Sequence, residues 1–274
     1  MNTPEPAPRS HDSVRTSVRD RYGRIVSAAA GCGGSAPAGS CSGSTSPVDA
    51  TAHDLGYTRA DIADAPTGSN LGLGCGNPVA IQSLRAGESV LDLGSGAGFD
   101  AFLAARAVGP TGRVIGVDMT WEMVQAARAN LAKSGRTNVE FRLGEIESLP
   151  VADASIDVVL SNCVVNLSPE KQRVFDEAHR VLRPGGRLAI SDIVALAPLS
   201  ADQRADLELH AGCIAGAASI AEVRAMLDRA GFVDVRIEPK AEVQPVVDGW
   251  FPGRGVAGKV ASANITARKA TGGS

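Results

Sequence analysis

Residues 90–100, which read VLDLGSGAGFD, restrict the fold of this chain more than any other stretch. The apolar residues Val90, Leu91 and Leu93 are typical of a buried strand. The glycines that alternate with small residues over 94–98 allow a tight turn against which a ligand can lie. A helix then begins near Ala101, and its first free N–H groups face back toward that ligand. The sequence therefore predicts a strand–loop–helix unit that binds a nucleoside-type cofactor, and the alternative is a tight turn without a ligand.

The spacing of these glycines indicates which cofactor fits. The dinucleotide fingerprint G-x-G-x-x-G, counted from Gly94, would put its third glycine at Phe99, but the sequence has Gly98 instead. This spacing argues against a nicotinamide oxidoreductase. The carboxylate of Asp92, just before the turn, suits a cationic ligand better than a diphosphate. The pattern resembles the motif of Rossmann-like methyltransferases that use S-adenosylmethionine.

Composition argues against several other classes of protein, namely nucleic-acid-binding, membrane-spanning and secreted proteins. The chain has 274 residues, of which 44% are hydrophobic, so it can bury a core of its own. A net charge of -3 and an aromatic content of 4% do not favour a nucleic-acid partner. No apolar run approaches the roughly 18 residues of a membrane span, and the run at 25–30 is shorter than the roughly 7–15 residues of a signal-peptide core. We therefore expect a cytoplasmic protein whose five cysteines are thiols.

Strand-like and helix-like segments alternate along the middle of the chain. This alternation predicts an α/β fold with a mostly parallel sheet that is covered by helices on both faces. The seven expected strands are 90–93, 112–118, 139–143, 156–161, 187–192, 233–237 and 260–267.

The two ends of the chain differ from this middle part. At the N-terminal end we expect a helix over 12–27 that packs on the main domain, a Gly/Ser-rich loop over 28–47 and a short helix over 54–62. After residue 198 we expect a helical insert over 201–209 and 212–217, then an amphipathic helix over 220–231. The sequence therefore predicts three parts. These are an N-terminal helix and loop (1–69), a cofactor-binding domain (70–197) and a C-terminal α+β substrate-binding part (198–274).

Cys75, Cys163 and Cys213 come from three segments that an α/β fold can bring to one crevice. Cys75 lies in a glycine-rich loop, Cys163 follows the fourth strand and Cys213 lies in the late helical insert. Three thiolates suit a soft, pyramidal trivalent centre such as As(III). Structural zinc needs four ligands, and His210 could be the fourth, although the chain has no C-x-x-C pair. Each cysteine taken singly could instead be a small core residue.

The segments around these thiols carry a closer resemblance. GCGNP, SNCVVNL and HAGCIAGA are similar to segments of the arsenite S-adenosylmethionine methyltransferases, and the resemblance extends from about Val18 to Arg268. It implies that Cys75, Cys163 and Cys213 hold As(III) as arsenite or methylarsenite. It also implies that an N-terminal thiol, either Cys32 or Cys41, pairs with Cys75 in a disulfide that thioredoxin or glutathione reduces.

The candidate cofactor-binding residues lie in the loops that follow the first four strands. The glycine loop would hold the methionine part of S-adenosylmethionine, and Asp118 ends the second strand where an acidic residue binds ribose hydroxyls. The resemblance implies that Glu145 and Ile146 frame adenine. Asn162, at the end of the fourth strand, is placed to hold the amine or the sulfonium. The full set is Asp92, Gly94, Ser95, Gly96, Gly98, Asp118, Met119, Glu145, Ile146 and Asn162.

The resulting hypothesis is a monomeric enzyme for arsenic detoxification that transfers a methyl group from S-adenosylmethionine to the lone pair of As(III). Such a nucleophile carries no proton, so the absence of an obvious general base in the motifs agrees with it. The first alternative is a methyltransferase of a small organic acceptor, such as a quinone precursor, which leaves the thiols unexplained. The second is a thiol-based binder of metalloid or zinc without enzymatic activity, which leaves the glycine loop unexplained.

Overall fold

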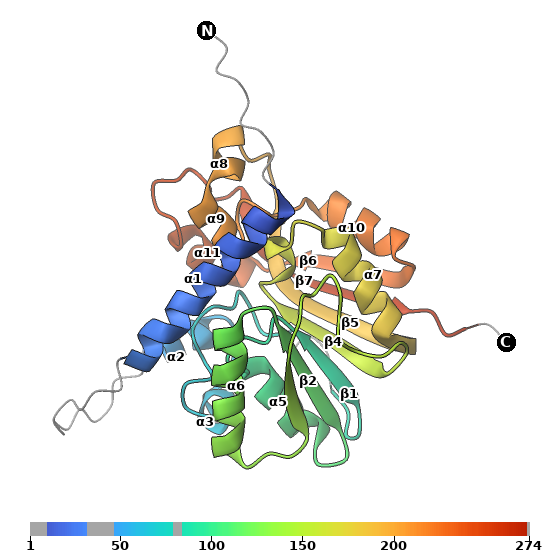
Figure 1. Cartoon of the computed structure of the whole chain (residues 1–274). Coiled ribbons are helices and arrows are strands. Elements are labelled where there is room, and N and C mark those ends of the chain that lie inside the picture. The colour runs from blue at the N-terminus through green and yellow to red at the C-terminus, as the bar shows by residue number, and fades with distance from the viewer. Residues whose placement is uncertain (1–9, 32–46, 79–83, 273–274) are drawn as a thin grey trace, which may run out of the picture.

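The structure is a computed structural model that describes residues 10–31, 47–78 and 84–272. Its centre is a seven-stranded sheet with the order β3-β2-β1-β4-β5-β7-β6 (Figure 1). The strands are β1 (Ser89–Leu93), β2 (Arg113–Asp118), β3 (Val139–Leu143), β4 (Ile156–Asn162), β5 (Leu182–Ala195), β6 (Phe232–Pro239) and β7 (Val260–Lys269). All seven expected strands are therefore present.

The first five strands are parallel to one another, and only β7 breaks this direction. β7 is antiparallel to both β5 and β6. The sequence order reverses between β1 and β4, so the carboxyl ends of these two adjacent strands border the crevice where open α/β sheets bind their ligands. The expected α/β class with a mostly parallel, Rossmann-like sheet is confirmed.

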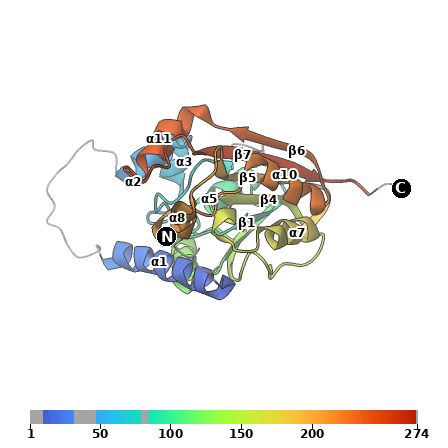
Figure 2. The same cartoon turned by 90° about the horizontal axis from the view of Figure 1, so that it is seen from above.

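Helices cover the two faces of the sheet, as Figure 2 allows the reader to follow. On one face, α5 (Phe99–Val108) and α6 (Trp121–Ser134) bury Phe102 and Val124 against the side chains of Val90 and Val114. On the other face, α7 (Lys171–Val181) and α10 (Ile220–Arg229) cover the remaining side chains of the same strands. Because alternate residues of each strand face opposite helices, the central strands β1, β2 and β4 are buried along almost their whole length.

The N-terminal helix α1 (His11–Gly31) crosses the molecule in front of the sheet and contacts α6, α9 (Leu207–Ala211) and η1 (Val165–Leu167) (Figure 1). Val18 of α1 is buried, and the hydroxyl of Tyr22 donates a hydrogen bond to the carbonyl of Ala211 at 3.2 Å. The expected packing of this helix on the main domain is confirmed. Cys32 and Cys41 lie outside the described residues.

Two expected helices are wrong. The helix expected over 54–62 is divided, because α2 (Pro47–Asp54) ends before Gly56, whose φ is +98°, and α3 (Arg59–Asp64) begins anew after the capping residue Thr58. The helix expected over 212–217 is a series of turns. α9 ends at Ala211, and Cys213 has a φ of +64°, which is incompatible with a helix.

The last part of the chain completes the sheet. Residues 198–274 contribute β6 and β7 together with α8 (Ala201–Ala205), α9, α10, η2 (Ala241–Val243) and α11 (Gln244–Gly249). The division of the chain at residues 70 and 198 stays a prediction.

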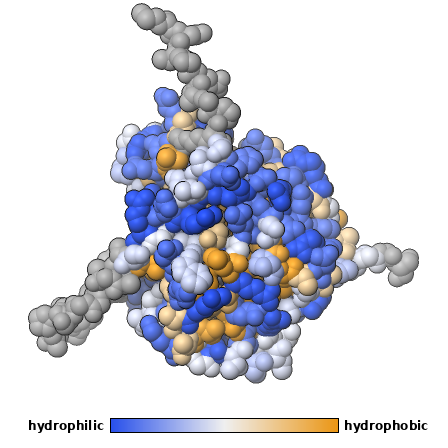
Figure 3. Space-filling view, viewed as in Figure 1, coloured by the Kyte–Doolittle hydropathy of each residue, from blue (hydrophilic) through white to orange (hydrophobic). Residues whose placement is uncertain are grey.

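Among the described residues, no helix is both long and apolar enough to cross a membrane. Figure 3 shows a largely hydrophilic face on which hydrophobic residues gather below α1.

Candidate active site

The glycine loop after β1 has the backbone conformation that its sequence predicts. Gly94, Gly96 and Gly98 have φ values of +65°, +51° and +99°, a region in which residues with a Cβ are strained. The amides of Gly94 and Ser95 both donate hydrogen bonds to the carbonyl of Val117, at 2.8 and 3.0 Å, which ties the loop to β2. The loop therefore forms a closed turn at the carboxyl ends of β1 and β2.

Three buried carboxyl groups surround this loop: Asp92 on β1, Asp100 in the first turn of α5 and Asp118 at the end of β2. Asp118 accepts hydrogen bonds from the amides of Gly96 at 2.9 Å and Thr120 at 2.8 Å. The Oδ2 atom of Asp92 is buried and has no hydrogen-bond partner among the described residues. A buried polar atom without a partner is costly, so this oxygen indicates a ligand with a positive charge or a hydrogen-bond donor.

The pKa values of these carboxyl groups reflect the same arrangement. Burial raises the pKa of Asp92 well above its usual value, and the neighbouring charges of Asp100 and Asp118 raise it further. Burial raises the pKa of Asp100 to about 6, against the hydrogen bonds from Tyr57 and Asn162, and it also raises the pKa of Asp118. A cation in the cleft would favour the ionised carboxylates. The sulfonium and ammonium groups of S-adenosylmethionine fit this requirement.

One cleft contains most of the candidate cofactor-binding residues. Ile146 and Glu147 line it beside the carboxylates, whereas Glu145 lies outside the lining among the described residues and forms ion pairs with Arg15 and Arg19, each at 3.6 Å. Gly98 is also outside the lining. The candidates that line the cleft are Asp92, Gly94, Ser95, Gly96, Asp118, Met119, Ile146 and Asn162.

The structure adds cleft residues that the sequence did not single out. Tyr57 is buried, and its hydroxyl donates a hydrogen bond to Oδ1 of Asp100 at 2.6 Å. Arg15 reaches the cleft from α1 and forms ion pairs with the buried Glu147 and with Glu170. Asp100 follows the glycine loop directly, so its position was a usable signal. Tyr57 and Arg15 lie far away in the sequence, where no local pattern indicates them.

Asn162 connects the cleft to the loop that carries Cys75. Its amide nitrogen lies within hydrogen-bond distance of the Tyr57 hydroxyl at 2.9 Å, the Gly76 carbonyl at 2.9 Å and Oδ2 of Asp100 at 3.0 Å. Its Oδ1 accepts a hydrogen bond from the amide of Cys75 at 3.0 Å. One side chain thus links the thiol-bearing loop to the acidic end of the cleft.

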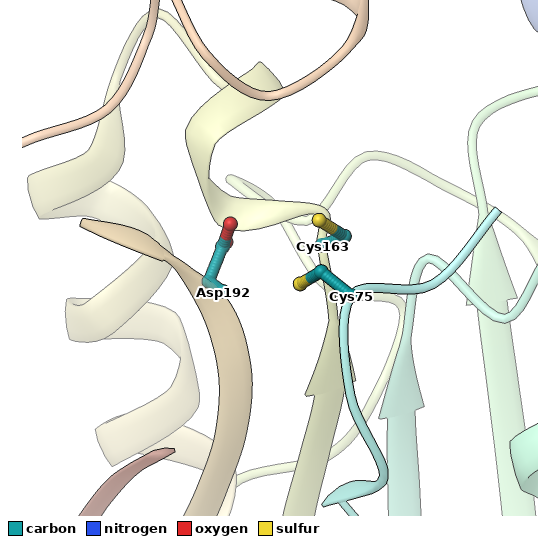
Figure 4. Close-up of side chains that lie close together, drawn as sticks. All are labelled: Cys75, Cys163 and Asp192. Carbon is teal, nitrogen blue, oxygen red and sulfur yellow. The ribbon is translucent and has the colours of Figure 1, made fainter. Parts of the chain in front are cut away.

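Two of the three thiols lie close together beside the cleft. Cys75, Cys163 and Asp192 form a set of buried side chains whose ligand atoms all lie within 4.8 Å of one another (Figure 4). Strand register explains why Asp192 joins the thiols. Asn162, the last residue of β4, is paired with Ser191 of β5, so Cys163, which directly follows β4, lies beside Asp192 of β5. The sequence reasoning missed Asp192, although the strand expected over 187–192 ended on it, as the strand expected over 112–118 ended on Asp118.

The third thiol, Cys213, contacts Cys163 and is not a member of that set. Its Sγ donates a hydrogen bond to the carbonyl of Cys163 at 2.8 Å. Both residues have left-handed backbones, with φ values of +59° for Cys163 and +64° for Cys213. Such conformations cost of order 1–3 kcal/mol for residues other than glycine and persist only where the surroundings impose them. The fold therefore imposes an unfavourable backbone on two adjacent cysteines.

The surroundings of Cys163 and Cys213 favour the uncharged form of these two thiols. Burial raises the pKa of Cys163 well above its usual value, and the adjacent side chains of Cys213 and Cys75 raise it further. For Cys213, the hydrogen bond with Cys163 lowers the pKa, but burial and the charge of Asp192 outweigh this effect and raise it.

His210, which the sequence offered as a fourth zinc ligand, lies outside the set of Cys75, Cys163 and Asp192. Its Nε2 lies 3.3 Å from the carbonyl of Leu167.

Comparison with known proteins places this geometry in a family. Residues 84–231 match a family model described as a methyltransferase domain. The chain is 52% identical over 270 residues to the arsenite methyltransferase of Halobacterium salinarum, a match that covers 96% of this chain and 68% of that protein. It is 44% identical over 180 residues to the arsenite methyltransferase of Aquipseudomonas alcaligenes, where the match covers 63% of this chain and 51% of that protein.

A solved structure agrees with these relatives. The crystal structure of an arsenic(III) S-adenosylmethionine methyltransferase from Chlamydomonas reinhardtii superposes with a TM-score of 0.60 at 33% identity, and the match covers 84% of this chain and 76% of that one. The chain spans about two thirds of the length of the Halobacterium salinarum protein and about half of the length of the Aquipseudomonas alcaligenes protein. The glycine loop, the three cleft carboxylates, Cys163 and Cys213 lie within residues 84–231, which match the methyltransferase model, whereas Cys75 precedes that range. The chain belongs to the arsenite methyltransferase family, within the methyltransferases of Rossmann-like fold.

Proposed function

We propose that this chain transfers the methyl group of S-adenosylmethionine to trivalent arsenic, with arsenite and methylarsenite as substrates. The observation that carries this proposal is the position of Cys163. It lines the cofactor cleft and at the same time lies within 4.8 Å, atom to atom, of the Cys75 thiol. An arsenic atom on these sulfurs would therefore lie beside the cofactor.

The chain supplies an acidic cradle for the cofactor. When bound, S-adenosylmethionine supplies an electrophilic methyl group on a positively charged sulfur. Asp92, with its unpartnered buried oxygen, and Asp100 would stabilise the positive charges of the methionine part. Asp118, already held by two backbone amides, would accept hydrogen bonds from ribose, and Ile146 would contact adenine. Glu145 would need to leave its ion pairs with Arg15 and Arg19 to join Ile146 there.

The thiols would capture the substrate by exchange. Arsenite, As(OH)3, reacts with three thiols to give a neutral three-sulfur complex and three molecules of water, so the thiol protons leave with the hydroxyl groups. Cys75 and Cys163 are already adjacent. Cys213 would join them by turning its Sγ away from the carbonyl of Cys163. The high pKa of Cys163 is no obstacle, because the proton departs only when the arsenic–sulfur bond forms.

Alignment is then the main contribution of the protein to the transfer. The nucleophile is the lone pair of arsenic, which carries no proton, so no side chain has to act as a base. Holding the two reactants in line can lower a barrier by roughly 7–11 kcal/mol. Asn162 serves this alignment, because it joins the Cys75 loop to Asp100 in the cleft.

The remaining predictions concern the surroundings of this reaction. We infer from the family resemblance that Cys32 or Cys41 pairs with Cys75 in a disulfide and that thioredoxin or glutathione reduces it. The monomeric state and the cytoplasmic location are also predictions. A small organic acceptor in place of arsenic would leave the three buried thiols without a role.

Arsenic speciation with single thiol variants tests the proposal. The purified protein is incubated with S-adenosylmethionine, glutathione and either arsenite or methylarsenite, and the products are separated and identified by mass spectrometry. We expect Cys75→Ser, Cys163→Ser and Cys213→Ser to lose arsenite methylation. Methyl transfer to the lone pair releases S-adenosylhomocysteine and leaves arsenic pentavalent. Glutathione then attacks one arsenic-bound sulfur, the two sulfurs leave as a disulfide, and arsenic regains its electron pair. Methylarsenite therefore keeps only two As–S bonds, and at least one variant should retain activity on it. Calorimetric binding of S-adenosylmethionine checks that each variant is folded.

Two results would contradict this proposal. Full activity of all three variants on arsenite would remove the thiols from the mechanism. Tight arsenite binding without any binding of S-adenosylmethionine would leave a metalloid-binding protein that is not an enzyme.

A further inference from the structure

We propose that Cys75, Cys163 and Asp192 form a binding site for a thiophilic divalent cation of the zinc class, which competes with trivalent arsenic for the same two sulfurs. The two thiols and the carboxylate are buried, and their ligand atoms all lie within 4.8 Å of one another (Figure 4). They come from three different segments, namely the loop before β1, the end of β4 and β5. The site goes beyond arsenic methylation, which requires no carboxylate.

The distances between the three ligand atoms are close to those that tetrahedral coordination of an ion needs. Neighbouring ligand atoms around zinc lie about 3.5–3.8 Å apart, as follows from Zn–S and Zn–O bonds of about 2.3 and 2.1 Å. Small side-chain rotations would bring the set from its present spacing to that value. The fourth position is available to Cys213, whose Sγ already contacts the carbonyl of Cys163, or to water.

The donor set distinguishes a divalent cation from arsenic. Trivalent arsenic forms a neutral complex with three soft sulfurs and makes little use of a hard carboxylate oxygen. Zinc and cadmium accept mixed sulfur and oxygen ligands. Two thiolates and one carboxylate carry three negative charges, which a divalent cation reduces to one. The ammonium of Lys171 is near enough to Asp192 to lower its pKa and would offset part of the remainder.

The carboxylate is held in place for such a role. Oδ1 of Asp192 accepts hydrogen bonds from its neighbour Ile193 N at 2.7 Å and from Nδ2 of Asn166 at 2.9 Å, and Oδ2 accepts one from Asn166 N at 3.2 Å. Outer hydrogen bonds of this kind orient metal ligands. The same bonds would also let Asp192 anchor η1 without any ion, so the experiment must separate a ligand from an anchor.

Measurements on the unaltered protein come first. The protein with all thiols reduced is loaded with one equivalent of Zn²⁺, freed of excess metal by gel filtration and examined by X-ray absorption at the zinc edge. We expect one retained equivalent, with two or three sulfurs and at least one oxygen in the first shell. Arsenite should release this zinc to a chromophoric chelator in a one-to-one ratio. A shell of sulfur alone, a shell without sulfur, no retained zinc, or zinc retained at saturating arsenite would each overturn the proposal.

A variant then separates the carboxylate from the thiols. Asp192→Asn preserves the shape of the side chain, and Cd²⁺ affinity is measured from the ultraviolet absorption of the cadmium–thiolate bond. We expect Asp192→Asn to weaken Cd²⁺ binding by at least about tenfold and to leave arsenite binding within about twofold. Glu88→Gln is the matched control, because the Glu88 carboxylate is mostly buried in an ion pair with Arg187 and lies outside both the set and the cleft, and this variant should leave Cd²⁺ affinity unchanged.

Equal losses of Cd²⁺ and arsenite affinity in Asp192→Asn would make Asp192 an anchor and overturn the proposal. If this variant does not fold, the ratio of sulfur to oxygen ligands around zinc in the unaltered protein decides whether a carboxylate takes part in the site. Failure here is distinguishable from failure of the methylation proposal. Arsenite methylation without zinc binding contradicts only the cation site, whereas zinc binding without methylation contradicts only the enzyme.

Discussion

Gly94 and Val164 lie so close together that a Cβ atom on Gly94 would be 2.3 Å from Cγ2 of Val164. Gly94 begins the cofactor loop, and Val164 directly follows the thiol of Cys163. Both residues line the same cleft. The backbone of the cofactor loop therefore rests directly on the segment that carries a substrate thiol, and any added atom at Gly94 would move both.

Gly94→Ala is expected to affect stability and cofactor binding together. Overpacking costs about 1–3 kcal/mol, in addition to the strain of alanine at a φ of +65°. The matched control is Gly135→Ala, because Gly135 has the same φ of +65° in the left-handed region and its added Cβ would meet nothing within 4 Å beyond its chain neighbours. Urea unfolding should show a larger loss for Gly94→Ala, and calorimetry should show weaker binding of S-adenosylmethionine for that variant alone. Equal unfolding free energies would disprove the close contact.

Asn162→Ala should uncouple the Cys75 loop from the cleft. The change removes the acceptor for the Cys75 amide and the donor to the Gly76 carbonyl, and each unsatisfied buried group costs about 1–3 kcal/mol. Asn138→Ala is the matched control. It also removes two hydrogen bonds, which the side chain of Asn138 donates to the carbonyls of Ala105 and Gly109 away from the cleft. Both variants should melt at lower temperature, but only Asn162→Ala should lower the affinity for arsenite. The same arsenite affinity in both would show that the link is only structural.

Arg15 is expected to hold α1 over the cleft. It is mostly buried and forms ion pairs with Glu147 and Glu170, and its removal would leave the buried Glu147 with fewer partners. Arg15→Ala should therefore loosen α1 and accelerate proteolytic cleavage within it, which mass spectrometry of limited digests measures. Arg24→Ala, which removes a hydrogen bond to the Asp20 carbonyl within the same helix, should digest like the unaltered protein. Unchanged digestion of Arg15→Ala would contradict this role.

The affinity for S-adenosylmethionine should rise with pH until Asp100 is ionised. Burial raises the pKa of Asp100 to about 6, and a cationic ligand binds the carboxylate in preference to the acid. One such proton changes the affinity by at most about tenfold per pH unit, so calorimetry from pH 5 to 7.5 should show an affinity that rises as the pH passes through about 6. Asp100→Asn should reduce this dependence. A flat profile for the unaltered protein would contradict it.

The protein without cofactor should show the opposite trend in stability. Asp100 has a pKa of about 6 when folded, above the value of about 3.9 in an unfolded chain. The folded state therefore holds the proton more tightly, and its contribution to stability is complete below about pH 4 and is lost as the pH rises through about 6. Asp192, whose pKa burial also raises to about 6, acts in the same direction. Thermal melts over this range, compared with Asp100→Asn, measure the effect.

The amino-acid sequence by itself determined the elements whose causes are local. An apolar run followed by spaced glycines is sufficient for β1, the loop and the start of α5, because those glycines alone tolerate the positive φ values of the turn. The ends of β2 and β4 could be located in the same way, and with them Asp118 and Asn162. Cys75, Cys163 and Cys213 were recognisable as a group, because their segments resemble those of one family.

Only the tertiary structure decided which side chains meet. Asp192 joins Cys75 and Cys163 because β5 pairs with β4 in one particular register, which no local pattern encodes. The segment at 212–217 has helical composition, but Gly216 packs so closely that a Cβ there would lie 2.1 Å from the carbonyl oxygen of Asn166. Local propensity is weak compared with such contacts. Helices and strands therefore follow from short stretches of sequence, whereas the site depends on the order and register in which the sheet assembles.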